Sequence, residues 1–270
     1  MARKNDLKGR LAVVTGASSG IGLCFCRTLA ARGCDLVMIS NQQVQLDECA
    51  DTVAGEFGVK TYPLFQDLTL PMAEHAVTAW LDANGLDPDY LVNNAGIFSF
   101  LPVTDTPEGK IKAFIDLHVA AVTNLSRAFA IRFVKRGAGR ILNMSSMSCW
   151  MPMPGIAMYS ATKAYIRVFS RALHYELRDS GVSVTVACPG GIATDLFGLP
   201  KRLQKLAVNI GAIQRPEVFT EKAVDKMLKG KKQYINGLIN RLAIFFIGIT
   251  PTSIRMMVKH RMLDRGIIRP

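Results

Sequence analysis

The sequence lacks the features that mark secreted, membrane-spanning and metal-binding proteins. Its longest apolar run, Leu242–Ile249, is far shorter than the roughly 20 residues that a spanning helix needs. The apolar run Leu11–Val14 is also too short for the core of a secretory signal peptide. The six cysteines show no paired metal-binding spacing, which predicts reduced, mostly buried thiols. We therefore expect a cytoplasmic protein with no metal site.

Acidic residues are scarce in the last quarter of the chain. Residues 201–270 hold 15 lysines and arginines against 4 acidic residues, whereas residues 1–200 hold 18 against 17. The formal net charge of +12 therefore belongs almost entirely to the C-terminal segment. Such an excess of positive charge suits binding to nucleic acid or to an anionic membrane. The sequence contains no groove-reading motif and no basic stretch interleaved with aromatic residues, so we expect no nucleic-acid partner.

What the sequence does have is an alternation of strand and helix patterns. Runs that are apolar at nearly every position predict strands buried on both faces, at Leu11–Thr15, Leu36–Ser40, Thr61–Gln66, Tyr90–Asn93, Arg140–Ser145 and Val182–Cys188. Helices are predicted at Gly20–Arg32, Gln42–Phe57, Pro71–Ala83 (capped by Thr69), Glu108–Lys135, Tyr159–Asp179 and Glu217–Leu228, before a short last strand, Gln233–Ile235. The pattern predicts an α/β fold, with one Rossmann-like domain over residues 1–270. Its doubly wound parallel sheet would have about seven strands, with helices on both faces.

A glycine-rich turn follows the first predicted strand. Gly16 allows a tight turn, Gly20 lets the backbone approach a pyrophosphate, and Gly22 lets the next helix pack closely on the sheet. The N-terminus of that helix would offer free N–H groups to the phosphates. The turn therefore predicts a dinucleotide site.

The motifs along the chain, taken in order, resemble those of the short-chain dehydrogenase/reductase superfamily, and above all its hydroxysteroid- and lipid-acting members with a C-terminal extension. They are Thr-Gly-x-x-x-Gly-x-Gly at 15–22, Asp67-Leu68, Asn93-Asn94-Ala95-Gly96, Ser146, Tyr159-x-x-x-Lys163, and the run from Pro189 to Thr194. The resemblance covers roughly residues 8–195. It implies an NAD(P)(H)-dependent oxidoreductase that interconverts a ketone and a secondary alcohol by hydride transfer.

Three of these residues carry the predicted proton chemistry. Tyr159 and Lys163 are four residues apart and share one face of a helix. An ammonium beside a phenol favours the phenolate, so we expect Lys163 to lower the pKa of Tyr159, the general acid/base. The resemblance implies that Ser146 holds the substrate oxygen. It also places His118 where many members carry an asparagine whose backbone carbonyl serves the proton relay; His118 either keeps that role or only packs the helix.

The resemblance assigns the cofactor to residues at the strand ends. They are Gly16, Ser18, Ser19, Gly20, Ile21, Gly22, Asn41, Asp67, Leu68, Asn94, Ala95, Gly96, Tyr159, Lys163, Pro189, Gly190, Ile192 and Thr194. Asn41 follows the second strand, where NAD-preferring relatives carry an acid and NADP-preferring ones carry an arginine. With no acid to repel a 2′-phosphate, NADP(H) is weakly favoured over NAD(H).

A methionine-rich segment, residues 147–158, adjoins the predicted catalytic centre. It suits either a broad apolar pocket or ordinary core and interface packing. In the first case Ser146, Met147, Trp150, Met153 and Tyr159 bind a lipophilic substrate, such as a steroid, bile acid, fatty ketone or acyl ketone. Residues 195–213 stand where the superfamily carries its substrate lid. Their interspersed cations suit an anionic substrate end, such as a carboxylate or a thioester carrier.

The last predicted element is a basic, apolar extension over residues 238–270. Its amphipathic pattern suits either peripheral contact with an anionic membrane or docking on its own domain or another subunit. By resemblance we expect a homodimer or homotetramer built on the two long helices. Two alternative functions stay open. One is a catalytically inactive NAD(P)-binding sensor or scaffold, and the other is a 3-oxoacyl thioester reductase.

Overall fold

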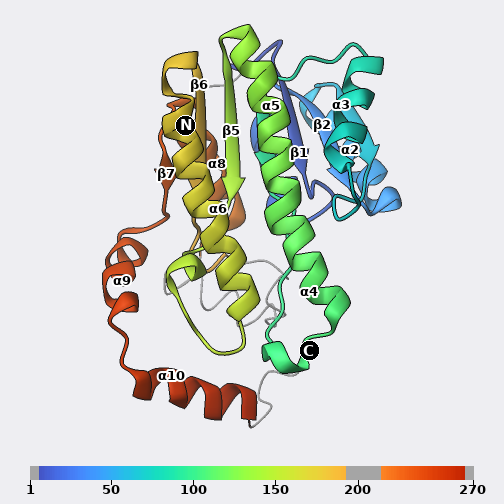
Figure 1. Cartoon of the computed structure of the whole chain (residues 1–270). Coiled ribbons are helices and arrows are strands. Elements are labelled where there is room, and N and C mark those ends of the chain that lie inside the picture. The colour runs from blue at the N-terminus through green and yellow to red at the C-terminus, as the bar shows by residue number, and fades with distance from the viewer. Residues whose placement is uncertain (1–5, 193–213, 265–270) are drawn as a thin grey trace.

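The computed structural model describes residues 6–192 and 214–264, which form a parallel sheet covered by helices (Figure 1). The strands are β1 (Leu11–Thr15), β2 (Asp35–Ser40), β3 (Thr61–Phe65), β4 (Tyr90–Asn93), β5 (Gly139–Met144), β6 (Val182–Ala187) and β7 (Gln233–Tyr234). Their order is β3-β2-β1-β4-β5-β6-β7, and each neighbouring pair is parallel. The predicted Rossmann-like sheet is therefore confirmed.

Helices cover both faces of this sheet. One face carries α1 (Gly20–Ala30), α2 (Gln43–Phe57) and α8 (Pro216–Leu228), and the other carries α3 (Ala73–Ala83), α5 (Val122–Arg136) and α6 (Ala157–Glu176). Ala12 and Val14 of β1 belong to the first core, whereas Val13 between them belongs to the second. Burial on both faces explains why the strand sequences are apolar throughout.

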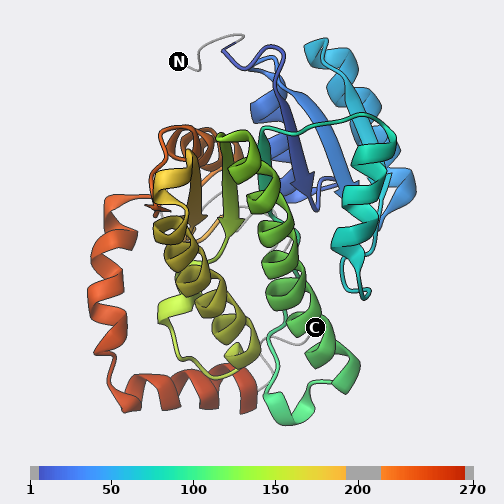
Figure 2. The ribbon, with the colours of Figure 1, turned by 45° about the horizontal axis from the view of Figure 1, so that its top comes forward.

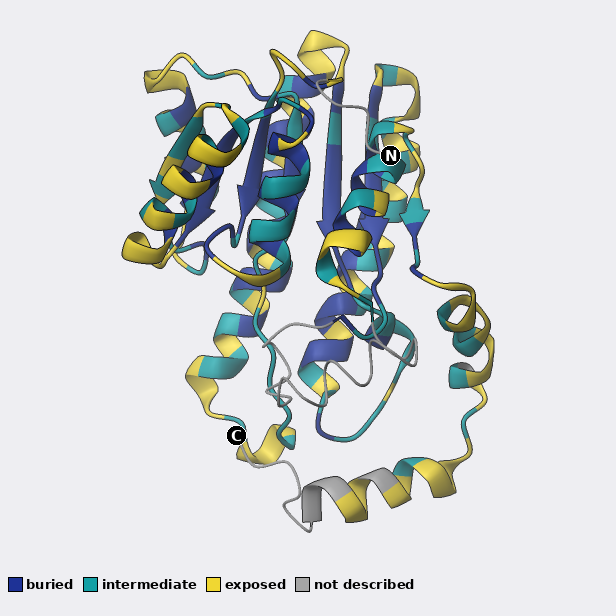
Figure 3. Cartoon of the chain, turned by 180° about the vertical axis from the view of Figure 1, so that it is seen from behind, coloured by how far each residue is buried: buried dark blue, intermediate teal, exposed yellow. Residues whose placement is uncertain are grey.

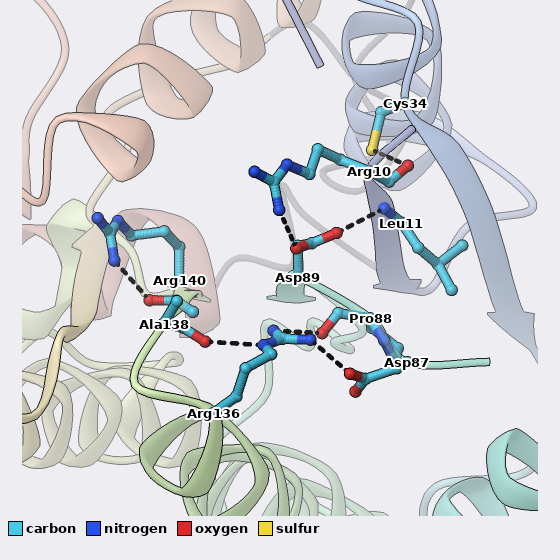
Figure 4. Close-up of polar contacts among 10 residues, drawn as sticks. Arg10, Leu11, Cys34, Asp87, Pro88, Asp89, Arg136, Ala138 and Arg140 are labelled. Atoms are coloured by element: carbon cyan, nitrogen blue, oxygen red, sulfur yellow. Dashed lines mark hydrogen bonds and ion pairs between the residues drawn. The ribbon is translucent and has the colours of Figure 1, made fainter. Parts of the chain in front are cut away.

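The amino edge of the sheet is fixed by arginines (Figure 4). Asp89, just before β4, accepts hydrogen bonds from the Arg10 guanidinium at 2.8 Å and from the Leu11 backbone N–H at 3.0 Å. Arg136, at the end of α5, pairs with Asp87 at 2.9 Å. These contacts set where β1 and β4 begin. The loops at the opposite, carboxyl edge include Asn94, whose backbone N–H donates to the Thr15 hydroxyl at 2.9 Å.

The predicted helix Glu108–Lys135 contains a π-helical turn. Residues Asp116–Ala121 form this turn and join α4 (Glu108–Ile115) to α5 without a break. By length and composition alone, the whole helix could cross a membrane. Phe129 and Phe133 on its apolar face are nevertheless fully buried in the core against the sheet. We therefore assign it to the core.

The predicted start of the third helix is wrong. The helix α3 begins at Ala73, after Met72, whose φ of 61° is left-handed. Thr69 does not cap it, because its hydroxyl donates to the Asp67 carboxylate at 2.7 Å. Asp67 is two residues from Thr69, whereas α3 begins four residues after it. The threonine hydroxyl therefore binds the nearby carboxylate and not the helix N-terminus.

Beyond β7 the chain forms a helix pair that stands away from the sheet (Figures 1 and 2). It consists of α9 (Leu238–Gly248) and α10 (Thr252–Val258), followed by a π-helical stretch, Lys259–Asp264. The pair is bent by 104° and is apolar enough for a broken span or a re-entrant loop. The end of the predicted extension, 265–270, and the predicted lid, 195–213, lie outside the described residues.

Candidate active site

A cavity of about 850 Å³ opens at the carboxyl ends of the strands. It lies where the chain order reverses, since β1 has β2 on one side and β4 on the other. Open α/β sheets bind their ligands at this point. Every predicted cofactor residue within the described chain lines the cavity, namely Gly16, Ser18, Ser19, Gly20, Ile21, Gly22, Asn41, Asp67, Leu68, Asn94, Ala95, Gly96, Tyr159, Lys163, Pro189, Gly190 and Ile192. The remaining predicted residue, Thr194, lies outside the described part.

Other cavity residues escaped the sequence prediction. They are Leu23, Cys24, Ile39, Ser40, Gln42, Gln66, Thr69, Ile97, Leu117, Met144, Ser145 and Pro216. All but Pro216 lie within two residues of a predicted site residue, so widening each motif would have found them. Pro216 begins α8 and reaches the cavity only through the tertiary fold.

The glycine turn is shaped for a phosphate group. Gly16 and Gly20 have φ values of 65° and 53°, in the left-handed region that favours glycine. A Cβ atom at Gly22 would lie 1.9 Å from the Gly16 carbonyl oxygen, so only glycine fits there. Ser19 at the N-cap of α1 makes no side-chain capping hydrogen bond. The N–H groups of this helix end therefore remain available to an anion.

The Asp67 carboxylate also lines the cavity, after the end of β3. Hydrogen bonds from the Thr69 backbone N–H at 2.9 Å and hydroxyl at 2.7 Å stabilise its charged form. The backbone bond has the largest effect on the pKa of Asp67, which lies below its ordinary value, and a hydrogen bond from Asn41 adds to it. Within the described chain no other acidic residue lines the cavity. The volume, the open helix end and these polar groups together fit a nicotinamide dinucleotide.

Two reciprocal hydrogen bonds join the end of β5 to α6. The Lys163 ammonium donates to the Met144 carbonyl oxygen at 3.0 Å, and the Ser145 hydroxyl donates to the Lys163 carbonyl oxygen at 2.7 Å. This junction brings Ser146, which follows β5, close enough to Tyr159 to lower the pKa of its phenol, and both residues line the cavity. The Lys163 Nζ atom lies 5.7 Å from the centre of the Tyr159 ring. The predicted trio is thus gathered at the cavity.

Burial shifts the pKa values of Tyr159 and Lys163. It raises the pKa of Tyr159 to about 12, although Ser146 acts in the opposite direction. It also lowers the pKa of Lys163 to about 8. The expected lowering of the Tyr159 pKa by Lys163 is therefore wrong for this structure. The loss of water around the phenol is the largest cause of its raised pKa, and the Lys163 ammonium donates to the Met144 carbonyl instead.

His118 lies in the π-helical turn and is fully buried. Its Nε2 atom accepts a hydrogen bond from the Ile97 backbone N–H at 3.1 Å, and its Nδ1 atom lies 2.9 Å from the Thr162 hydroxyl. That hydroxyl donates to the Met158 carbonyl at 2.9 Å, so Nδ1 carries the ring proton and donates to Thr162. Burial, with a smaller contribution from Lys163, lowers the pKa of His118 to about 2.

The neutral His118 ring therefore holds two segments in place. It joins the loop after β4 to α6, and it is not part of the cavity wall within the described chain. Both ring nitrogens are engaged, which leaves the imidazole no free group for proton transfer. A relay role through the His118 backbone carbonyl stays a prediction.

The methionine-rich segment lies beside the cavity rather than in its described wall. Ser146 and Tyr159 line the cavity, whereas Met147, Trp150 and Met153 do not. The Trp150 ring instead packs on Arg167, whose guanidinium carbon lies 4.3 Å from the ring centre. The Met147 backbone N–H donates to the Pro189 carbonyl at 2.7 Å. The short helix Met147–Trp150 lies against α6 and α9, and substrate binding by Met147, Trp150 and Met153 stays a prediction.

Comparison with known families decides the class of the protein. The family model described as short chain dehydrogenase matches residues 10–202. The chain belongs to the short-chain dehydrogenase family. It is therefore an NAD(P)-dependent oxidoreductase by class, which agrees with the glycine turn and the serine–tyrosine–lysine trio.

The curated relatives of this dehydrogenase include lipid enzymes. The mouse very-long-chain 3-oxoacyl-CoA reductase is 35% identical over 198 residues, which are 72% of this chain and 62% of that protein. The Macaca fascicularis protein of the same name is 33% identical over 261 residues, which are 94% of this chain and 80% of that protein. The human inactive hydroxysteroid dehydrogenase-like protein 1 is 33% identical over 227 residues, which are 81% of this chain and 66% of that protein. The chain thus spans less than two thirds of the mouse relative.

A solved structure supports the fold. A short-chain dehydrogenase from Sphingobium yanoikuyae in complex with NADPH has a TM-score of 0.77 and is 29% identical. The match covers 94% of this chain and 97% of that one. The similarity extends over the sheet and helices described above.

The buried histidine predicts a pH-dependent stability. Because the pKa of His118 is lower in the folded chain than in the unfolded chain, its contribution is present above the unfolded pKa and is lost as the pH falls. We expect the free energy of unfolding to fall by up to about 1.4 kcal/mol per pH unit below about pH 6.5 through this group. His118→Asn should remove that part of the slope, which urea unfolding between about pH 7.5 and pH 5.5 measures.

His75→Asn is the matched control, since that histidine is exposed. It should leave the pH slope of the wild-type protein unchanged. Equal slopes for the wild-type protein and His118→Asn would contradict the neutral, buried state assigned to the ring.

Proposed function

We propose that this dehydrogenase reduces the ketone of a lipophilic 3-oxoacyl thioester to a secondary alcohol with NADPH. The observation that carries the proposal is the meeting of Ser146, Tyr159 and Lys163 at the edge of a cavity that fits a dinucleotide. The very-long-chain 3-oxoacyl-CoA reductases among its relatives support the acyl substrate. Steroid, bile-acid and other fatty ketones are the second substrate class.

The chain's own groups supply the proton and the positioning. A nicotinamide coenzyme bound in the cavity would supply the hydride for the carbonyl carbon of the substrate. Tyr159 donates its phenolic proton to the carbonyl oxygen, and the Ser146 hydroxyl holds that oxygen by a hydrogen bond. Burial raises the pKa of Tyr159, so the phenol is protonated at neutral pH and can donate its proton to the substrate oxygen. Lys163 would hold the nicotinamide ribose.

An inactive NAD(P)-binding scaffold is the competing function. A human relative carries the word inactive in its name, which keeps this alternative relevant. The intact trio of Ser146, Tyr159 and Lys163 favours the enzyme. A wild-type protein that binds NADPH but turns over no ketone from a broad acyl and steroid panel would favour the scaffold.

Removing the phenolic hydroxyl tests the reaction directly. Tyr159→Phe should lower the turnover of a long-chain 3-oxoacyl-CoA by about 10²–10⁴-fold, because the general acid is lost. NADPH oxidation reports the rate. Tyr165→Phe is the matched control on the same helix, since the Tyr165 hydroxyl is bonded to Thr123 rather than placed at the cavity. Full turnover in Tyr159→Phe would overturn the mechanism.

We also propose a preference for NADP(H) over NAD(H). Asn41 lines the cavity after β2 and brings no negative charge against a 2′-phosphate. The NADPH-bound relative of similar fold supports this choice. Asn41→Asp should shift the ratio of kcat/KM for NADPH and NADH at least about tenfold toward NADH, because a carboxylate repels the phosphate and accepts from the ribose hydroxyls.

Gln43→Glu provides the control for added charge. Gln43 starts α2 next to the site but does not line the described cavity. It should leave the coenzyme ratio unchanged. An Asn41→Asp variant with the wild-type ratio would contradict the proposed role of Asn41.

We further propose a homodimer or homotetramer built on α5 and α6. These helices leave Ile131, Val134, Tyr165 and Val168 exposed, and an exposed apolar patch of this kind suits a second copy of the chain. Light scattering should give a multiple of the chain mass for the wild-type protein. Val168→Asp should shift it toward the monomer. A monomeric wild-type protein at micromolar concentration would contradict this.

For the location we propose the cytoplasm, with residues 238–270 in contact with an anionic membrane surface. The described part of this segment consists of α9, α10 and the π-helical stretch Lys259–Asp264, and many residues of the two α-helices are exposed (Figure 3). Its cationic residues suit acidic lipid headgroups.

A further inference from the structure

The wall of the cavity and the helix α9 meet at a single glycine. Gly190, which lines the cavity, donates its backbone N–H to the Asn236 Oδ1 atom at 2.7 Å. A Cβ atom at Gly190 would lie 2.4 Å from the Asn240 Nδ2 atom, so the Asn240 side chain presses directly against this backbone. Asn240 belongs to the first turn of α9.

Asn236 is the centre of this contact. It follows β7 and is only 3% exposed, and its amide group is engaged on both sides. Its Nδ2 atom donates to the Gln214 Oε1 atom at 3.1 Å, while Asn240 donates to the Asn236 carbonyl oxygen at 2.9 Å. We call these two asparagines the asparagine clamp: Asn236 is bonded to Gly190, and Asn240 is bonded to Asn236 and packs against Gly190. The clamp fixes α9 to the cavity wall.

The short helix after Ser146 reaches the same turn from the other side. The Met147 backbone N–H donates to the Pro189 carbonyl oxygen at 2.7 Å. The turn Pro189–Gly190 is therefore held between the helix Met147–Trp150 and α9. A movement of α9 relative to the sheet would displace this turn, which lines the cavity and contacts the residue after Ser146.

The outer side of α9 is unusually apolar for a helix facing water. Large side chains that are each more than half exposed cover it, namely Leu238, Ile239, Leu242, Phe245 and Phe246, with Ile249 just beyond its end. Ile254, Met256 and Met257 on the following helix add to the same exposed set. Soluble monomers rarely leave contiguous apolar patches of this kind without a partner.

Charge indicates which partner this surface fits. Residues 238–263 contain Arg241, Arg255, Lys259 and Arg261 but no aspartate or glutamate. Helices with an apolar side and cationic flanks lie in the plane of an anionic lipid surface. The sharp bend between α9 and α10, 104°, leaves each helix far too short to cross a bilayer of about 30 Å by itself. An anionic lipid surface is therefore the occupant to which charge and shape point.

We propose that the asparagine clamp couples lipid binding by the α9–α10 pair to coenzyme binding in the cavity. The inference rests on the proposed function, because it takes the cavity to bind NADPH. A lipid surface that fixes α9 holds Gly190 in the position that the coenzyme meets. Linkage then requires that the coenzyme strengthens lipid binding by the same factor.

The test measures coenzyme affinity with and without lipid, using the full chain and no substrate. NADPH is titrated by its fluorescence in buffer, with vesicles of phosphatidylcholine, and with vesicles that contain phosphatidylserine. Wild-type protein should bind NADPH at least about fivefold more tightly with the anionic vesicles than without vesicles. Neutral vesicles should have a smaller effect.

Two variants separate the clamp from the surface. Asn240→Ala should raise the NADPH dissociation constant about 3- to 10-fold without vesicles and abolish the vesicle effect, while the protein still sediments with anionic vesicles. The double variant Phe245→Ser and Phe246→Ser should lose sedimentation and keep the wild-type affinity in buffer. Asn84→Ala is the matched control, since Asn84 also donates to a carbonyl four residues earlier, at the exposed end of α3.

The outcomes distinguish this inference from the proposed function. If the wild-type protein binds NADPH but anionic vesicles leave its affinity unchanged, the coupling is wrong and the enzyme assignment stands. If Asn240→Ala behaves like Asn84→Ala in both measurements, the clamp is not the link. If the wild-type protein binds no nicotinamide coenzyme, the proposed function itself fails. The wild-type titration does not depend on how either variant folds.

Discussion

The reciprocal bonds between Lys163 and the end of β5 are the constraint on which the site depends. A buried ammonium is costly unless its donors are satisfied, and the Met144 carbonyl accepts one of the three N–H groups of Lys163. The Lys163 carbonyl in turn accepts from Ser145, so α6 cannot slide along the sheet without breaking both bonds. Ser146 and Tyr159 take their relative position from this junction. The proposed proton chemistry therefore depends on main-chain carbonyls as much as on the reactive side chains.

Sequence reasoning succeeded where function is encoded locally. The glycine turn and the strand ends predicted the described cavity because the carboxyl ends of parallel strands meet at one edge. It failed where burial decides. The pKa of Tyr159 depends on how much water the folded chain excludes. The sequence left two settings open for Trp150, and its contact with Arg167, a residue on another element, appears only in the fold. No local pattern carries either piece of information.

The distribution of charge separates two kinds of anion recognition. Among the described residues that line the cavity, Lys163 is the one cation and Asp67 the one acid, so phosphates there would be met by backbone N–H groups and a helix end. The excess positive charge of the chain lies elsewhere, in its last quarter. The phosphates of a coenzyme would thus be bound by backbone N–H groups in the cavity. An anionic lipid surface would be bound by lysine and arginine side chains on the other side of the asparagine clamp.

The π-helical turn at His118 also has a consequence for rotational phase. A π turn holds an extra residue compared with an α-helical turn, and one residue corresponds to about 100° of rotation around a helix axis. The π turn therefore rotates the side chains of α5 by about 100° relative to an unbroken α-helix continued from α4. In this orientation Phe129 and Phe133 of α5 are fully buried against the sheet, while Leu117 of the turn itself lines the cavity.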